Sequence, residues 1–234
     1  MKTLIIPDLH EPSAAVLDCI EDLIRRERPD RTVFLGDYFD QYNDGPADTE
    51  RMASWLSNSL GKENRVHLIG NHDASYFWPC DTTYCPGFTW EKEAVVQRIL
   101  GAAAHARFQF HTWIEGWLLT HAGLAAAWVP EGIDVAPWLE SEARNAWTAF
   151  AQDRDHWFLA TGSLRGGRQR AGGILWADWR EPRWPGRQIF GHTPAAVVRQ
   201  DSTAICLDTN LGKGPQHAVV LIDGVPTVRP IRAA

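Results

Sequence analysis

Side chains that can bind a metal ion or move a proton follow several predicted buried strands of this sequence. The first-half strand candidates are four short apolar runs at residues 3–6, 32–35, 66–69 and 117–120. The polar residues that come directly after these runs, and after a later run at 188–190, are Asp8, His10, Asp37, Asp40, Asn71, His72, Asp73, His121 and His192. Because the carboxyl ends of parallel strands meet at one edge of a sheet, we expect these groups to lie together.

The residue types indicate the kind of metal site. Carboxylates, imidazoles and an amide oxygen, with no thiolate, suit Mn²⁺, Fe²⁺ or Zn²⁺ better than Ca²⁺, which prefers oxygen ligands, or a cysteine-rich structural zinc site. Six or more ligands exceed what one tetrahedral ion needs. Two ions that share a carboxylate account for the number of ligands, and such pairs serve phosphoryl transfer and other hydrolytic reactions. The pattern therefore predicts a dinuclear hydrolytic centre.

Helical patterns alternate with the strand candidates. Apolar residues recur at helical spacing over residues 16–24, after Pro12, a residue type favoured at the first position of a helix. Further helices are predicted at 47–60, 91–104 and 136–151. The opening order of strand, helix and strand predicts a parallel unit.

The last quarter of the sequence has a different pattern. Its apolar runs alternate with turn residues and lie at 188–190, 195–199, 203–207 and 217–222. Asp223-Gly224 is a strong hairpin signal, and we expect this part to form antiparallel sheet. Glycines crowd residues 162–173, which we interpret as a loop because regular elements on both sides continue one α/β pattern. A single domain over residues 1–234 is therefore predicted.

Composition excludes several classes of protein. The apolar fraction of 44% and the charged fraction of 22% are ordinary for a globular protein, and no apolar run approaches the ~20 residues that span a bilayer. The 23 basic and 29 acidic residues give a net charge of −6, which argues against a dedicated nucleic-acid binder. Polar residues come too early for a secretory signal. We expect a cytoplasmic protein without a membrane partner.

The four cysteines are too few for a disulfide framework in a chain of this length. Cys19 and Cys206 lie in apolar runs and are expected to be buried thiols. Cys80 and Cys85 bracket a short loop. They could form a local disulfide or half of a zinc site, although no second cysteine pair is present to complete such a site.

As an ordered set, the polar motifs resemble those of the calcineurin-like metallophosphoesterase superfamily. They are DLH at 8–10, GDYFD at 36–40, GNHD at 70–73, THAG at 120–123 and GHT at 191–193. LWAD at 175–178 and LDTN at 207–210 are similar to segments of the phosphoprotein-phosphatase-like branch. Together with the strand and helix pattern, the resemblance implies an α/β fold in which two mixed β-sheets pack as a sandwich flanked by helices.

The resemblance also implies a role for each motif residue. The metal ligands would be Asp8, His10 and Asp37 for the first ion, and the bridging Asp37 with Asn71, His121 and His192 for the second. A hydroxide bridging the two ions would attack phosphorus. His72 would be the general acid that protonates the leaving oxygen, and Asp40 would orient its ring. Mn²⁺ is the expected metal, with Fe²⁺ and Zn²⁺ as alternatives.

Two positions depart from the pattern of related proteins. Many members of the superfamily have a second histidine in GHxH, where this chain has Pro194; the phosphoprotein-phosphatase branch shares that absence. That branch usually has an arginine after GDxxD to grip the phosphate, where this chain has Gln41. An arginine fork suits phosphate oxygens, so Arg165 is our first candidate for this role, ahead of Arg168 and Arg170 in the glycine-rich loop.

These observations predict a metal-dependent phosphoric ester hydrolase, specifically a phosphatase that acts on monoesters in a phosphoprotein or small molecule. The alternatives are a nucleotide hydrolase that cleaves dinucleoside polyphosphates, a phosphodiesterase, and a noncatalytic metal-binding scaffold. A scaffold has no need to retain Asp40 and His72 with every ligand position. Trp78, Trp90, Trp176 and Trp179 lie near the motifs and could stack on a base or another planar group.

Overall fold

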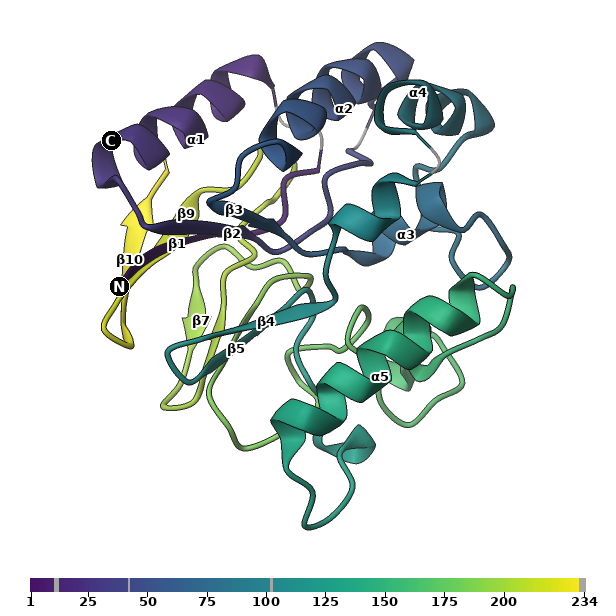
Figure 1. Ribbon diagram of the computed structural model, residues 1–234, viewed down its shortest axis with the longest axis vertical. Helices are drawn as coiled ribbons and strands as arrows, with labels where there is room; N and C mark the ends of the chain where they lie inside the picture. The colour runs from purple at the N-terminus through teal and green to yellow at the C-terminus, as the bar shows by residue number, and fades with distance from the viewer. Residues whose placement is uncertain (11–12, 42, 102, 232–234) are drawn as a thin grey trace.

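Two five-stranded sheets form the centre of the fold (Figure 1). The computed structural model describes residues 1–10, 13–41, 43–101 and 103–231. The first sheet has the strand order β10 (Val225–Pro230), β9 (His217–Ile222), β1 (Lys2–Ile6), β2 (Arg31–Phe34) and β3 (Arg65–His67). The second has the order β4 (His111–Ile114), β5 (Trp117–Thr120), β6 (Gln188–Phe190), β8 (Ala204–Cys206) and β7 (Arg199–Gln200).

The two sheets pack face to face, which confirms the predicted sandwich. Alternate residues of the strands point into one shared apolar cluster, to which the first sheet contributes Ile5 and Val33 and the second contributes Leu119 and Ile189. Both sheets are mixed. Strands β1, β2 and β3 are parallel, as are β5, β6 and β8, so their carboxyl ends lie at common edges.

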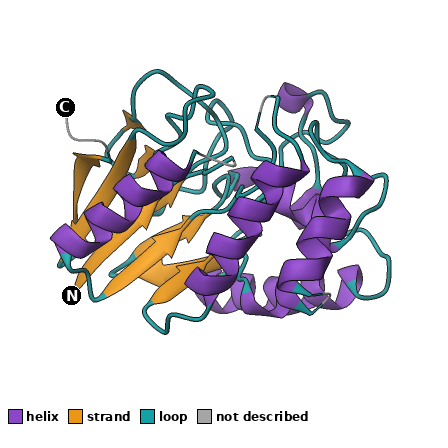
Figure 2. Ribbon diagram, turned by 90° about the horizontal axis from the view of Figure 1, so that it is seen from above, coloured by secondary structure: helices purple, strands orange, loops and turns teal. Residues whose placement is uncertain are grey.

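Among the described residues, five α-helices flank the sheets. They are α1 (Ala14–Glu27), α2 (Pro46–Leu60), α3 (Asn71–Phe77), α4 (Trp90–Leu100) and α5 (Val135–Phe150). Helices α1 and α2 cover the outer face of the first sheet, and α5 lies beside the second (Figure 1). Seen from above, a helix lies over the strands and runs roughly along them (Figure 2). Helix α1 packs on the sheet through apolar residues at helical spacing. Val16, Ile20 and Leu23 all point from α1 into the large core cluster.

Most predicted elements are confirmed, and three predictions need correction. The last quarter is antiparallel only in part, because β6 pairs in parallel with both β5 and β8. The helix predicted at 91–104 ends at Leu100, where Gly101 adopts a left-handed φ of 83°. Of the run at 66–69 only the first two residues belong to β3; Leu68 forms an isolated bridge with Gln109, and α3, which was not predicted, begins at Asn71. Pro12 lies outside the described residues.

In the part of the chain that the structure describes, no helix is both long and apolar enough to cross a membrane. The single domain over residues 1–234 stays a prediction.

His67, at the end of β3, is a buried neutral histidine. Its ring stacks on Phe34 with centroids 4.8 Å apart, and its two nitrogens meet the hydroxyls of Tyr38 at 3.0 Å and Ser59 at 3.1 Å. Burial, reinforced by the charge of Arg65, lowers the pKa of His67 to about 3. The uncharged ring is therefore part of the core.

We expect His67 to make stability depend on pH. An unfolded chain protonates this histidine below pH 6.5, whereas the folded chain does not until about pH 3, so its contribution is complete above pH 6.5 and is lost as the pH falls. Between pH 7.5 and 5.5 the free energy of unfolding should fall by about 1.4 kcal/mol through this group. Urea unfolding of the metal-free wild type and of His67→Gln at both pH values measures this change in the free energy of unfolding. An identical pH dependence in the two proteins would contradict the assignment.

Candidate metal centre

The loops after β2, β3, β5 and β6 bring four predicted ligands to one buried point. His121 Nε2 lies 2.9 Å from Asn71 Oδ1 and 3.2 Å from His192 Nδ1. The same nitrogen lies 3.4 Å from Asp37 Oδ2. His121 Nδ1 faces the carbonyl oxygen of Leu35 at 2.9 Å, so Nδ1 donates to that oxygen and Nε2 is the nitrogen that faces the other three side chains. Nitrogen and oxygen ligand atoms thus converge at one point, which suits a cation.

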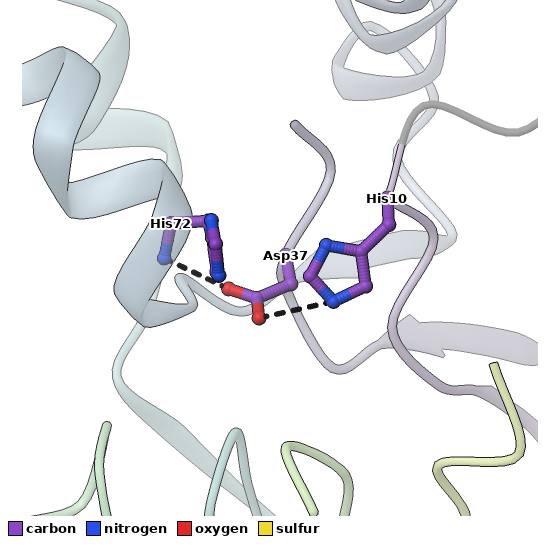
Figure 3. A group of neighbouring side chains, drawn as sticks. All are labelled: His10, Asp37 and His72. Atoms are coloured by element: carbon purple, nitrogen blue, oxygen red, sulfur yellow. Dashed lines mark hydrogen bonds and ion pairs between the residues drawn. The ribbon is translucent and has the colours of Figure 1, made fainter. Parts of the chain in front are cut away.

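Asp37 also faces a second group of potential ligands. The ligand atoms of His10, Asp37 and His72 all lie within 4.8 Å of one another. Asp37 lies between the two histidines, with Oδ2 3.5 Å from His10 Nε2 and Oδ1 accepting a hydrogen bond from the backbone N–H of His72 at 3.0 Å (Figure 3). His10 Nδ1 faces the carbonyl oxygens of Phe39 and Asp40, so its Nε2 is also the lone-pair nitrogen. Asp37 therefore belongs to both groups of potential metal ligands.

Asp8 lies next to these groups without belonging to either. Its Oδ2 accepts the backbone N–H of His192 at 2.8 Å. Its Oδ1 is buried, and so is His192 Nε2; neither atom has a hydrogen-bond partner among the described residues. Buried polar atoms normally have partners, so these two fit a site that binds a cation. The role of Asp8 as a ligand stays a prediction.

Four of the predicted site residues have left-handed backbone conformations. The φ angles are 48° at His10, 51° at Asp37, 66° at Asp40 and 67° at His192. Such angles are uncommon outside glycine and cost of order 1–3 kcal/mol each, so they persist where surrounding contacts enforce them. Their concentration here indicates that the loops are shaped for the site.

The electrostatics of the centre also favour a cation. Burial raises the pKa of Asp8, and the negative charges of Asp208 and Asp37 raise it further. Burial alone would lower the pKa of His121, but the carboxylates of Asp37 and Asp8 raise it to about 9. Burial and the neighbouring charge of His121 hold the pKa of His192 well below its usual range. The carboxylates would gain most from a positive charge between them.

The predicted general acid is held by a buried chain of polar contacts. His72 Nδ1 lies 2.9 Å from Asp40 Oδ2. Asp40 Oδ1 accepts hydrogen bonds from the hydroxyl of Tyr76 and, at 2.6 Å, from Lys92 Nζ. Lys92 also contacts Asp44 at 2.6 Å and is almost completely buried. Removing one partner of such a buried pair typically costs 3–5 kcal/mol, so these contacts fix Asp40 strongly.

Sequence reasoning missed Lys92 and Asp208. Lys92 belongs to the first turn of α4, where a lysine is usually exposed, and no motif marks it. Asp208 is buried, its pKa is raised by burial, and its charge acts on Asp8. Its only signal was the LDTN motif at 207–210, to which no role was assigned.

Arg165 lies beside the metal groups, as its proposed role requires. Its Nη2 donates to Thr193 Oγ1 at 2.8 Å and to the carbonyl oxygen of His192 at 3.3 Å. Its Nε lies 3.0 Å from Asp178 Oδ2, so the LWAD segment anchors the guanidinium. The alternative candidates Arg168 and Arg170 are exposed.

The cysteine alternatives are also settled within the described residues. All four cysteines are free, so Cys80 and Cys85 form no disulfide. Neither belongs to a group of three potential metal ligands among these residues. Cys85 instead contacts Asn71, whose side-chain amide lies 3.3 Å from its sulfur.

Comparison with known proteins agrees with this geometry. The profile of the family described as calcineurin-like phosphoesterase matches residues 1–196. The chain belongs to the calcineurin-like phosphoesterase family. No curated protein matches the sequence. Family membership supports a hydrolase and a divalent metal requirement, and the groups around Asp37 are the candidate ligands.

Solved structures show the same fold at low sequence identity. A cold-active protein-tyrosine phosphatase from a psychrophilic Shewanella species is 12% identical, with a TM-score of 0.61 over 99% of this chain and 80% of its own. A protein serine/threonine phosphatase from Saccharomyces cerevisiae is 15% identical, with a TM-score of 0.58 over 100% of this chain and 80% of its own. A putative diadenosine tetraphosphatase is 18% identical, with a TM-score of 0.50 over 98% of this chain and 93% of its own.

A substitution at Gly191 tests whether Asp8 is a metal ligand in this phosphoesterase. A Cβ at Gly191 would lie 1.7 Å from Asp8 Oδ1, so Gly191→Ala must displace the carboxylate. We expect Mn²⁺ affinity, measured by isothermal titration calorimetry, to fall about 10- to 100-fold, as when other groups that orient ligands are changed. Gly45→Ala is the matched control, because a Cβ there meets no atom within 4 Å. Equal Mn²⁺ affinity in the two variants would exclude Asp8 as a ligand.

Proposed function

We propose that this phosphoesterase is a phosphomonoesterase that works with two divalent ions, Mn²⁺ before Fe²⁺ or Zn²⁺. The observation that carries the proposal is the pairing of His72 with Asp40 beside Asp37. It combines a proton donor with two groups of metal ligands, the parts that metal-assisted hydrolysis of a phosphate ester uses. Both phosphatase neighbours described above act as precedents for this fold, although at their low identity they support no substrate.

The site residues would divide into those that hold ions and those that hold the phosphate. The proposed ion ligands are Asp8, His10 and Asp37 for one ion, and Asp37, Asn71, His121 and His192 for the other. When bound, the ions would lower the pKa of water and neutralise charge on the phosphate oxygens. Arg165, anchored by Asp178, would orient the phosphate through its remaining guanidinium donors.

His72 would supply the proton to the leaving oxygen. Asp40 accepts a hydrogen bond from the Nδ1–H of His72, so the proton available for transfer is on Nε2. Lys92 and Tyr76 hold the other oxygen of Asp40, which keeps the imidazole from turning. The side chain of His72 is 18% exposed, so a substrate can reach it.

A nucleotide hydrolase is the second candidate, favoured by an aromatic pocket next to the centre. The putative diadenosine tetraphosphatase among the structural neighbours is consistent with it. A phosphodiesterase and a metal-binding scaffold are the remaining alternatives. The cytoplasmic location and the absence of membrane and nucleic-acid partners stay predictions from the sequence.

The first test compares p-nitrophenyl phosphate with bis-p-nitrophenyl phosphate. Protein stripped of metal and reloaded with Mn²⁺ should hydrolyse the monoester with the higher kcat/KM. Asp37→Asn should lose both Mn²⁺ binding and activity, because the shared carboxylate is weakened for both ions. Preference for the diester would instead favour a phosphodiesterase. Wild type without bound metal or activity on either substrate would favour the scaffold.

A second test addresses His72. His72→Ala should lower kcat about 10²–10⁴-fold on an alkyl phosphate, whose leaving oxygen needs a proton, and much less on p-nitrophenyl phosphate. His105→Ala, a partly buried histidine outside the metal groups, is the control and should leave both rates unchanged. Equal losses on both substrates would remove His72 from the general-acid role.

A further inference from the structure

A pocket of about 520 Å³ has Trp176 in its wall, and this tryptophan contacts His192 of the metal centre. Its walls include the tryptophans Trp128, Trp157 and Trp176, with Tyr84 and polar side chains from Asp81, Arg168 and Gln169. This volume is within the range of small-molecule sites, which combine aromatic walls with a few polar groups. None of these residues belongs to the proposed metal or proton-transfer groups.

Two contacts connect the wall of the pocket to the metal centre. The ring of Trp176 contacts the ring of His192 edge to face, with centroids 5.5 Å apart. The loop that places Arg165 against His192 also supplies Gly167, Arg168 and Gln169 to the pocket wall. A substituent on a phosphate held at the metal centre would therefore lie near the pocket wall at Trp176.

The aromatic wall is built as a rigid stack. Trp157 lies between Trp138 and Trp128, with ring centroids 5.6 Å and 5.1 Å away and interplanar angles of 12° and 19°. The indole N–H of Trp128 donates to the carbonyl oxygen of Gly172 at 2.9 Å, which fixes the end ring of the stack. A planar ligand group could extend this stack at little entropic cost, because the rings are already ordered.

We propose that this pocket binds the nucleoside part of a nucleotide whose phosphate is bound at the metal centre. The base would stack at the Trp128 end of the aromatic wall. The carboxylate of Asp81 and the amide of Gln169 would accept and donate hydrogen bonds to the ribose hydroxyls and base edge, groups that a simple phenyl ester lacks. The inference rests on the proposed function and specifies its substrate class.

The test uses the full chain loaded with Mn²⁺ and two ligands that resist hydrolysis. Isothermal titration calorimetry compares adenosine 5′-(α,β-methylene)diphosphate with methylenediphosphonate, which has the two linked phosphonate groups without the nucleoside ester. We expect the adenosine compound to bind at least about 10-fold more tightly, since base stacking on aromatic side chains contributes on that scale. Hydrolysis of p-nitrophenyl phosphate is measured on the same samples.

Substitutions in the pocket test whether the difference in affinity between the two ligands arises there. Trp128→Ala and Tyr84→Ala should each reduce the preference for the adenosine compound by several-fold and leave methylenediphosphonate binding unchanged; Tyr84 is 40% exposed, so its loss should not affect folding. Trp113→Ala, outside the pocket, is the matched control and should keep the preference. A preference that survives in both pocket variants would overturn the inference.

The outcomes separate this inference from the proposed function. If wild type hydrolyses p-nitrophenyl phosphate and binds methylenediphosphonate, but adenosine adds no affinity, only the nucleoside pocket is overturned. If it neither hydrolyses the ester nor binds methylenediphosphonate, the proposed function fails and the inference fails with it.

Discussion

One buried carboxylate joins the loops on which the metal centre depends. Asp73 accepts hydrogen bonds from the backbone N–H groups of Asp37, Tyr38 and Gly70, each at 2.8 Å. These bonds connect the loops after β2 and β3 and hold the backbone of the proposed bridging ligand. Burial and the charge of Asp37 raise the pKa of Asp73 to about 7. A cation in the site would offset the charge of Asp37 and so favour the ionised form of Asp73, which couples metal binding to loop geometry.

The second sheet completes the site because β5 and β6 run in parallel. His121 and His192 therefore leave the sheet at the same edge, opposite the loop that carries Asp37. In the loop before α3 the backbone must approach Asp37 closely, since a Cβ at Gly70 would lie 2.1 Å from Asp37 Oδ1. Gly70 of the GNHD motif and Gly191 of the GHT motif are thus required for steric reasons, because a Cβ at either position would collide with Asp37 or Asp8.

Sequence reasoning succeeded where local pattern carries the information. The runs at 117–120, 188–190 and 217–222 match β5, β6 and β9 in full, because each is a short apolar stretch between polar turn residues. Pattern does not identify the partner of a strand, so the parallel pairing of β6 with β8 was missed. The role of Lys92 could not be predicted either, since it depends on Asp40, a residue 52 positions away that only the folded chain brings near.

The pairing of β1 with β9 has a consequence for the order in which the protein matures. Lys2 lies opposite Ile222, so the strand that leads to Asp8 gains its second neighbour only when the C-terminal strands have formed. The proposed ligands themselves come from segments between residues 8 and 192. Closing such long loops is slow, and no short fragment contains the whole ligand set. Under the proposed ligand set, the complete metal site would therefore form only after these distant segments have come together, and chains that lack the C-terminal strands would leave an unpaired strand edge open to aggregation.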